Sequence, residues 1–106
     1  MKIQFLIPAI IIASLLITGI EGCQKQQASV EIKNFAFNPS EISIDKGTSV
    51  TWTNKDSVTH DITIDSGLFD HDLNPGESFS FIFNEPGTYD YHCDIHPSMK
   101  GRIIVQ

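Results

Sequence analysis

The chain has 106 residues, of which 13 are acidic and 7 are basic, and its formal net charge is −6 at neutral pH. A chain of this length holds one small domain, which excludes a multi-domain enzyme. The acidic balance also argues against nucleic acid as a partner, because DNA and RNA are bound through basic surfaces. We expect a small acidic domain that is monomeric.

The N-terminal segment has the pattern of an export element. After Lys2, residues 3–20 form a largely apolar run without a charge, followed by Gly22 and Cys23. Such a run is typical of an export signal, and its length approaches that of a membrane span. Residues 20–23 resemble the lipobox of bacterial lipoproteins, in which the cysteine carries lipid after cleavage, although Glu21 departs from that pattern. Lipidation at Cys23, a retained anchor helix and simple secretion stay open as alternatives.

This leader divides the chain into three parts. We expect a signal peptide or membrane anchor at residues 1–22, a polar tether at residues 23–27 and one folded domain at residues 28–106. Every alternative for the leader places the domain outside the cytoplasm, in the periplasm or at the cell surface. Two cysteines in an exported protein usually suggest a disulfide. We expect none here, because Cys23 lies at the leader boundary and Cys93 lies in a motif that needs a free thiolate.

After the tether, apolar and polar residues alternate in short segments. A period of two is typical of β-strands, and clusters of Gly, Pro, Asn and Asp separate the segments. Seven strands are predicted, at residues 30–33, 42–45, 49–53, 59–64, 78–83, 88–93 and 101–105. Residues 65–73 predict only an irregular edge or loop. Regularly spaced strands in so small a domain favour an all-β sandwich of about seven or eight strands.

The same alternation predicts which side chains face the core. The expected inward residues are Val50, Trp52, Val58, Ile62, Ile64, Phe79, Phe81, Phe83, Tyr89, Tyr91, Ile103 and Val105. His60 and Cys93 are in phase with these buried faces. A histidine inside an apolar stripe needs a polar partner or a metal, because burying it alone is costly. His92 is expected on the opposite face, and His71 in a solvated acidic loop.

Three soft or borderline metal ligands follow one another on a single loop. Cys93, His96 and Met99 stand at three-residue intervals directly after a predicted strand. A thiolate, two imidazoles and a weak thioether are the ligand set of mononuclear electron-transfer copper sites. The loop lacks a second histidine, and the in-phase position of His60 can supply it. We therefore expect one copper ion held by these four side chains.

The loop also resembles that of a known family. Residues 91–101, with the sequence YHCDIHPSMKG, look like the C-terminal ligand loop of cupredoxins of the plastocyanin and amicyanin type, and the short Cys-x2-His-x2-Met spacing resembles amicyanin more. Further matches are FAFNP at 35–39, VTWTN at 50–54, NPGESF at 74–79 and PGTY at 86–89, so the similarity covers residues 30–105. The resemblance implies an eight-stranded Greek-key sandwich with copper at one end.

One position departs from the family pattern. Relatives often carry asparagine directly after the first histidine ligand, where it ties the two ligand-bearing loops together, and this chain has Asp61. A carboxylate cannot donate as an amide does unless it is protonated. We therefore expect the usual bond between the loops to be missing. An ionised Asp61 near the metal would favour Cu(II) and lower the reduction potential.

The resemblance implies a carrier of single electrons between a redox donor and a redox acceptor, and not an enzyme. The leading alternative is an extracytoplasmic copper-binding or copper-delivery module that uses the same ligands and releases the metal. An open-site redox enzyme would require Met99 to give way to an exchangeable ligand. A metal-free adhesion sandwich would not account for the presence of the four metal-ligating side chains.

Overall fold

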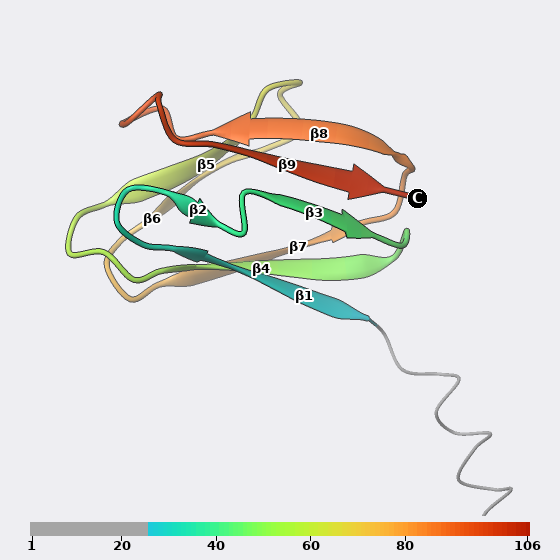
Figure 1. Ribbon diagram of the computed structural model, residues 1–106, viewed down its shortest axis with the longest axis horizontal. Helices are drawn as coiled ribbons and strands as arrows, with labels where there is room; N and C mark the ends of the chain where they lie inside the picture. Colours follow the sequence, from blue (N-terminus) through green and yellow to red (C-terminus); the bar gives the residue numbers. More distant parts are fainter. Residues whose placement is uncertain (1–25) are drawn as a thin grey trace, which may run out of the picture.

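In the computed structural model, which describes residues 26–106, the chain folds into β-strands that are joined by short turns and loops (Figure 1). The strands of this part of the chain are β1 (Gln27–Ile32), β2 (Phe37–Asn38), β3 (Glu41–Ile44), β4 (Thr48–Asn54), β5 (His60–Ile64), β6 (Asp70–Leu73), β7 (Ser78–Phe83), β8 (Gly87–His92) and β9 (Lys100–Val105). All seven predicted strands are present, and β1 begins at Gln27.

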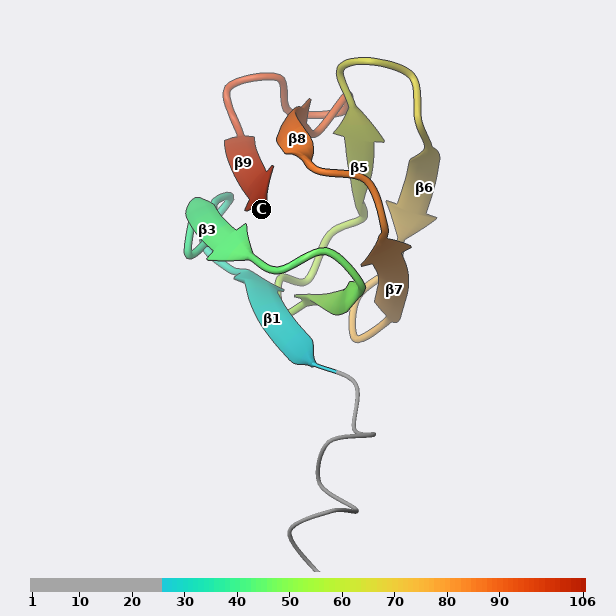
Figure 2. The ribbon, with the colours of Figure 1, turned by 90° about the vertical axis from the view of Figure 1, so that its right-hand side faces the viewer.

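These strands form two sheets that pack face to face (Figure 2). One sheet has four strands in the order β2-β1-β4-β7, and the other has five in the order β3-β9-β8-β5-β6. The pairs β1 with β4 and β3 with β9 are parallel, whereas the other neighbours are antiparallel. The all-β sandwich is confirmed, with nine strands in place of the predicted seven or eight.

The two strands missed in the sequence lie at sheet edges. Residues 65–73 were expected to be irregular, but β6 pairs with β5 along Asp70–Leu73. Its first three residues are all exposed, so an edge strand of this kind shows no apolar alternation. β2 contains only two residues and pairs with the end of β1, which is too short for any period to be visible.

Aromatic side chains fill the space between the sheets. Trp52 is fully buried, and its ring lies 5.6 Å from that of Tyr91 and 6.4 Å from that of Phe83, measured between centroids. Such pairs add to the stabilisation from burial alone. Most of the expected inward residues are buried or partly buried, but Val58 is wrong: it precedes β5 and is 39% exposed.

The loops at one end of the sandwich bring distant parts of the sequence together. The connections β1–β2, β4–β5 and β8–β9 gather at the left-hand end in Figure 1, whereas β1 begins and β9 finishes at the opposite end. Among residues 26–106 there is no helix long and apolar enough to cross a membrane. The predicted leader and Cys23 lie outside the described residues.

Candidate metal centre

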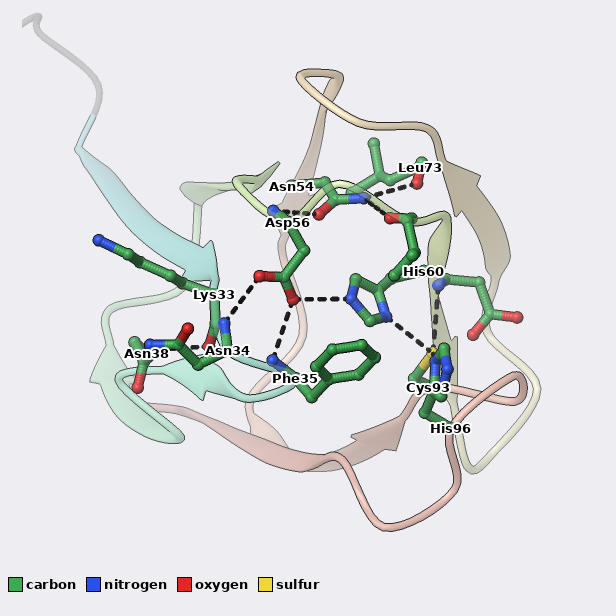
Figure 3. A network of polar contacts seen from close by, with 12 residues as sticks. Lys33, Asn34, Phe35, Asn38, Asn54, Asp56, His60, Leu73, Cys93 and His96 are labelled. Atoms are coloured by element: carbon green, nitrogen blue, oxygen red, sulfur yellow. Dashed lines mark hydrogen bonds and ion pairs between the residues drawn. The ribbon is translucent and has the colours of Figure 1, made fainter.

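His60 opens β5 and is completely buried. Its Nε2 donates to Oδ2 of Asp56 over 2.9 Å (Figure 3). This bond assigns the ring proton to Nε2 and leaves the lone pair of Nδ1 free, which is the usual way in which a second partner orients a histidine ligand. The free Nδ1 lies 3.8 Å from Sγ of Cys93, which is 33 residues away in the sequence.

Cys93 directly follows β8, and its thiol is buried and unoxidised. The backbone N–H of Asp61 points at Sγ over 3.4 Å. A donor directed at sulfur stabilises the thiolate, the form that binds metals. The backbone N–H of Cys93 in turn donates to the carbonyl of Met99 over 3.1 Å, which closes the loop between β8 and β9.

His96 and Met99 lie within this closed loop. Nδ1 of His96 is 4.0 Å from Sγ of Cys93, and its ring centroid is 5.0 Å from that of His60. The N–H of Met99 donates to the carbonyl of His96 over 2.9 Å, so the loop turns back on itself. The Met99 side chain is buried at 2% exposure, whereas His96 is only partly buried.

The spacing of these donors suits one metal ion. The ligand atoms of His60, Cys93 and His96 all lie within 4.8 Å of one another. Metal–sulfur bonds of about 2.3 Å and metal–nitrogen bonds of about 2.0 Å, opened to about 120°, place sulfur and nitrogen about 3.7 Å apart. The observed separations of 3.8 Å and 4.0 Å are close to this trigonal arrangement.

Comparison with known proteins assigns the chain to a family. The family model described as a cupredoxin-like domain matches residues 6–105. The chain belongs to the cupredoxin family. This confirms the resemblance found in residues 91–101.

Individual relatives agree with this assignment. Amicyanin-alpha of Methylorubrum extorquens is 36% identical over 103 residues, which are 89% of this chain and 87% of that protein. The chloroplastic plastocyanin of Physcomitrium patens is 36% identical over 107 residues, 88% of this chain and 64% of that protein. A solved structure, a purple cupredoxin from Nitrosopumilus maritimus, superposes with a TM-score of 0.68 at 35% identity, covering 74% of this chain and 99% of that one.

The cofactor of this cupredoxin is one copper ion, and the residues present fit it. A thiolate, two imidazoles and a thioether are soft and borderline donors that suit copper in both of its oxidation states. The buried sulfur and the fixed tautomer of His60 are what such a site requires.

Asp61 behaves differently from the expectation. Its Oδ1 accepts from the N–H of Asp94 over 2.6 Å, so the bond between the two ligand-bearing segments is made. The expectation of a missing bond was wrong, because this role requires an acceptor, which a carboxylate supplies as well as an amide does. Burial raises the pKa of Asp61, and the nearby carboxylates of Asp94 and Asp70 raise it further, while the Asp94 amide counters them.

The sequence did not reveal the residues that hold the β4–β5 loop in place. Asn54 is fully buried; its Oδ1 accepts from the N–H of Asp56 over 2.9 Å, and its Nδ2 donates to the carbonyls of Val58 and Leu73. Burial raises the pKa of Asp56, but bonds from the Phe35 amide, His60 and the Asn34 amide outweigh it and lower the pKa below its usual value. The carboxylate that accepts the hydrogen bond from the buried His60 is therefore itself fixed.

Phe35 is a second residue whose role was not visible in the sequence. Phe35 is 51% exposed, and its ring lies edge-on to His60 at 5.2 Å and to His96 at 4.9 Å between centroids. Asn34 and Phe35 have φ of 55° and 56°, in the left-handed region. Asparagine tolerates that region, but a bulky residue there costs about 1–3 kcal/mol.

The remaining histidines lie outside the cluster. His92 bonds through both ring nitrogens, to Asp65 over 2.6 Å and to Asp94 over 2.7 Å. These two partners raise the pKa of His92. His71 lies on β6, not in a loop, and stacks on Phe79 with the ring centroids 4.1 Å apart.

Proposed function

We propose that this cupredoxin carries single electrons between a redox donor and a redox acceptor outside the cytoplasm, and that His60, Cys93, His96 and Met99 hold its copper ion. The observation that carries the proposal is the convergence of two imidazole nitrogens on one buried sulfur at 3.8 Å and 4.0 Å. Bound copper supplies reversible one-electron chemistry at the thiolate. The rate of electron transfer and the access of partners depend on how the protein surrounds the copper.

The surroundings favour electron transfer without movement. His60 is held by Asp56, Cys93 by the Asp61 amide, and the loop by its own backbone bonds. Ligands fixed in this way keep one geometry for both charge states of a metal, so little reorganisation accompanies the gain or loss of an electron. Burial of Met99 in the same loop supports its assignment as the weak fourth ligand.

The exposure of the ligands indicates where the electron leaves. His60 and Cys93 are completely buried, whereas His96 is only partly buried. Two apolar side chains near His96, Phe35 and Ile95, are about half exposed. The edge of His96 is therefore the proposed contact with a redox partner, and the apolar rim would exclude water from that contact.

The location and the anchoring are part of the proposal. The apolar run at residues 3–20 supports export to the periplasm or the cell surface, with attachment through a retained helix or through lipid at Cys23. We propose that the protein acts as a monomeric carrier and not as an enzyme. Mass spectrometry of the membrane fraction tests the anchoring, since lipidation removes residues 1–22 and adds acyl chains to Cys23.

Addition of Cu(II) to the purified protein tests the site. We expect an intense blue absorption and an EPR spectrum with narrow parallel hyperfine splitting at one copper per chain. Cys93→Ser should abolish the colour, whereas His92→Gln, a histidine change on the opposite strand face, should retain it. A colourless Cu(II) protein, or blue colour that survives loss of the thiol, would contradict the proposal.

A second measurement separates a carrier from a copper-delivery module. A carrier should retain copper against a moderate chelator through repeated cycles of reduction and oxidation. Ready loss of Cu(I) to an apo-acceptor, with slow electron exchange, would favour delivery instead.

A further inference from the structure

The carboxylate of Asp56 joins two parts of the site that are far apart in the sequence. It accepts from the N–H of Asn34 over 2.8 Å, from the N–H of Phe35 over 2.9 Å and from Nε2 of His60 over 2.9 Å (Figure 3). These donors come from the β1–β2 connection and from β5, while Asp56 itself lies between β4 and β5. One side chain thus fixes a buried ligand and a surface turn together.

The turn at Asn34 and Phe35, which Asp56 binds, does not contribute to the stability of the fold in an obvious way. Two consecutive residues other than glycine have positive φ, and the second is a phenylalanine that is half exposed. A strained backbone that displays an apolar ring to solvent gains little burial. Strain of this kind persists where the surroundings enforce it, and it is most often found at functional sites.

The Phe35 ring lies against the two histidines of the site. It makes edge contacts with the imidazoles of both His60 and His96, and it is exposed beside the partly buried His96. The ring therefore forms part of the surface that a redox partner would meet. The backbone N–H groups of Phe35 and of its neighbour Asn34 both bind the Asp56 carboxylate.

We propose that Asp56 is a positioning residue that holds the Phe35 ring against the two imidazoles and thereby keeps the partner-facing surface around His96 in one arrangement. This inference rests on the proposed electron-transfer function. A fixed apolar ring allows close, dry contact at His96 without first being ordered, so it lowers the entropic cost of each encounter. Asn54 supports the arrangement, because its Oδ1 accepts from the N–H of Asp56.

Amide exchange in the metal-free protein tests the first half of the proposal. Asp56→Ala should accelerate hydrogen–deuterium exchange at the amides of Asn34 and Phe35 by about tenfold or more, equivalent to at least ~1.4 kcal/mol of lost protection. Asp45→Ala is the matched control. It removes the same charge from an exposed turn between β3 and β4 and should leave both amides unchanged. Unchanged protection in the Asp56 variant would overturn the proposal.

A double-variant cycle in the copper protein tests the second half. Asp56→Ala and Phe35→Ala should each slow electron self-exchange by about tenfold. Because Asp56 also binds His60, Asp56→Ala should slow the Phe35→Ala protein further, but by a clearly smaller factor than it slows the wild type. Losses that multiply in the double variant would mean that the two residues act independently, which would refute the positioning role.

Asp56→Asn tests the same contacts if Asp56→Ala does not fold. It keeps one acceptor oxygen and replaces the other with an NH₂ group, which cannot accept from an amide. One of the two amides should then exchange about tenfold faster and the other should stay protected; full protection of both would overturn the proposal. If the wild-type protein is not blue or does not exchange electrons, the proposed function fails, but the metal-free amide exchange still decides the role of Asp56.

Discussion

Replacing Gly101 by alanine should displace the Tyr91 ring and destabilise the domain. The two residues face each other in the β8–β9 register, and a Cβ at Gly101 would lie 2.5 Å from Cε1 of Tyr91 and closer still to Cζ and Oη. Carbon atoms in favourable contact are about 3.5–4.0 Å apart, so the ring must move by more than about 1 Å.

Large aromatic side chains pack against the Tyr91 ring on its core side. Tyr91 is 1% exposed and packs on Trp52 at 5.6 Å and on Phe37 at 4.7 Å between centroids. Forcing extra atoms into a packed core costs about 1–3 kcal/mol, and the upper end applies here because the neighbours are large rings. We expect a loss of about 3 kcal/mol in the free energy of unfolding.

Urea unfolding of the metal-free protein measures this loss. In a Tyr91→Ala background, Gly101→Ala should cost less than about 0.5 kcal/mol, because the obstructing ring is gone. The copper spectrum should also change, since Cys93 directly follows β8, two residues after Tyr91. A Gly101→Ala protein as stable as the wild type would show that the packing argument is wrong.

Two further substitutions test the electrostatics around the site. Asp61→Asn keeps an acceptor for the Asp94 amide but removes a charge, so the reduction potential should rise by on the order of tens of millivolts; protein-film voltammetry that finds it unchanged or lower would contradict this. His92→Gln should cost at most about 1 kcal/mol of stability, because its carboxylate partners are largely exposed. Since Asp65 and Asp94 raise the folded pKa of His92, that cost should be full below about pH 6.5, the unfolded value, and should disappear as pH rises through the folded value. A difference between wild type and variant that grows toward high pH in thermal melts would exclude this assignment.

The residues of the site that could be predicted are those marked by a short motif or by the pattern of a single strand. Cys93, His96 and Met99 share one loop, and His60 is marked by being a polar residue in phase with an apolar strand face. The interaction of Asp61 was misjudged because the sequence shows the residue type but not which atom faces the Asp94 amide.

The supporting residues could not be predicted because their partners are remote. Asp56 binds amides 21 and 22 residues away, and its spacing from His60 alone does not show that the two meet. Phe35 was noticeable only as a family match, since an aromatic residue after a strand usually belongs to the core. The edge strand β6 was hidden for a related reason: it lacks the apolar face that makes a strand recognisable.

The positions of the chain ends relative to the ligand loops have a consequence for how partners approach. The chain enters β1 at one end of the sandwich, and the loops bearing the donors lie at the other (Figure 1). A strand as long as β4, with seven residues at about 3.3 Å each, separates the two ends by about 23 Å. In a protein attached to a bilayer at its N-terminus, the redox-active pole would point away from the lipid headgroups. Soluble carriers would then reach it from the aqueous side, and a membrane-embedded oxidoreductase could do so only by projecting a domain of its own above the surface.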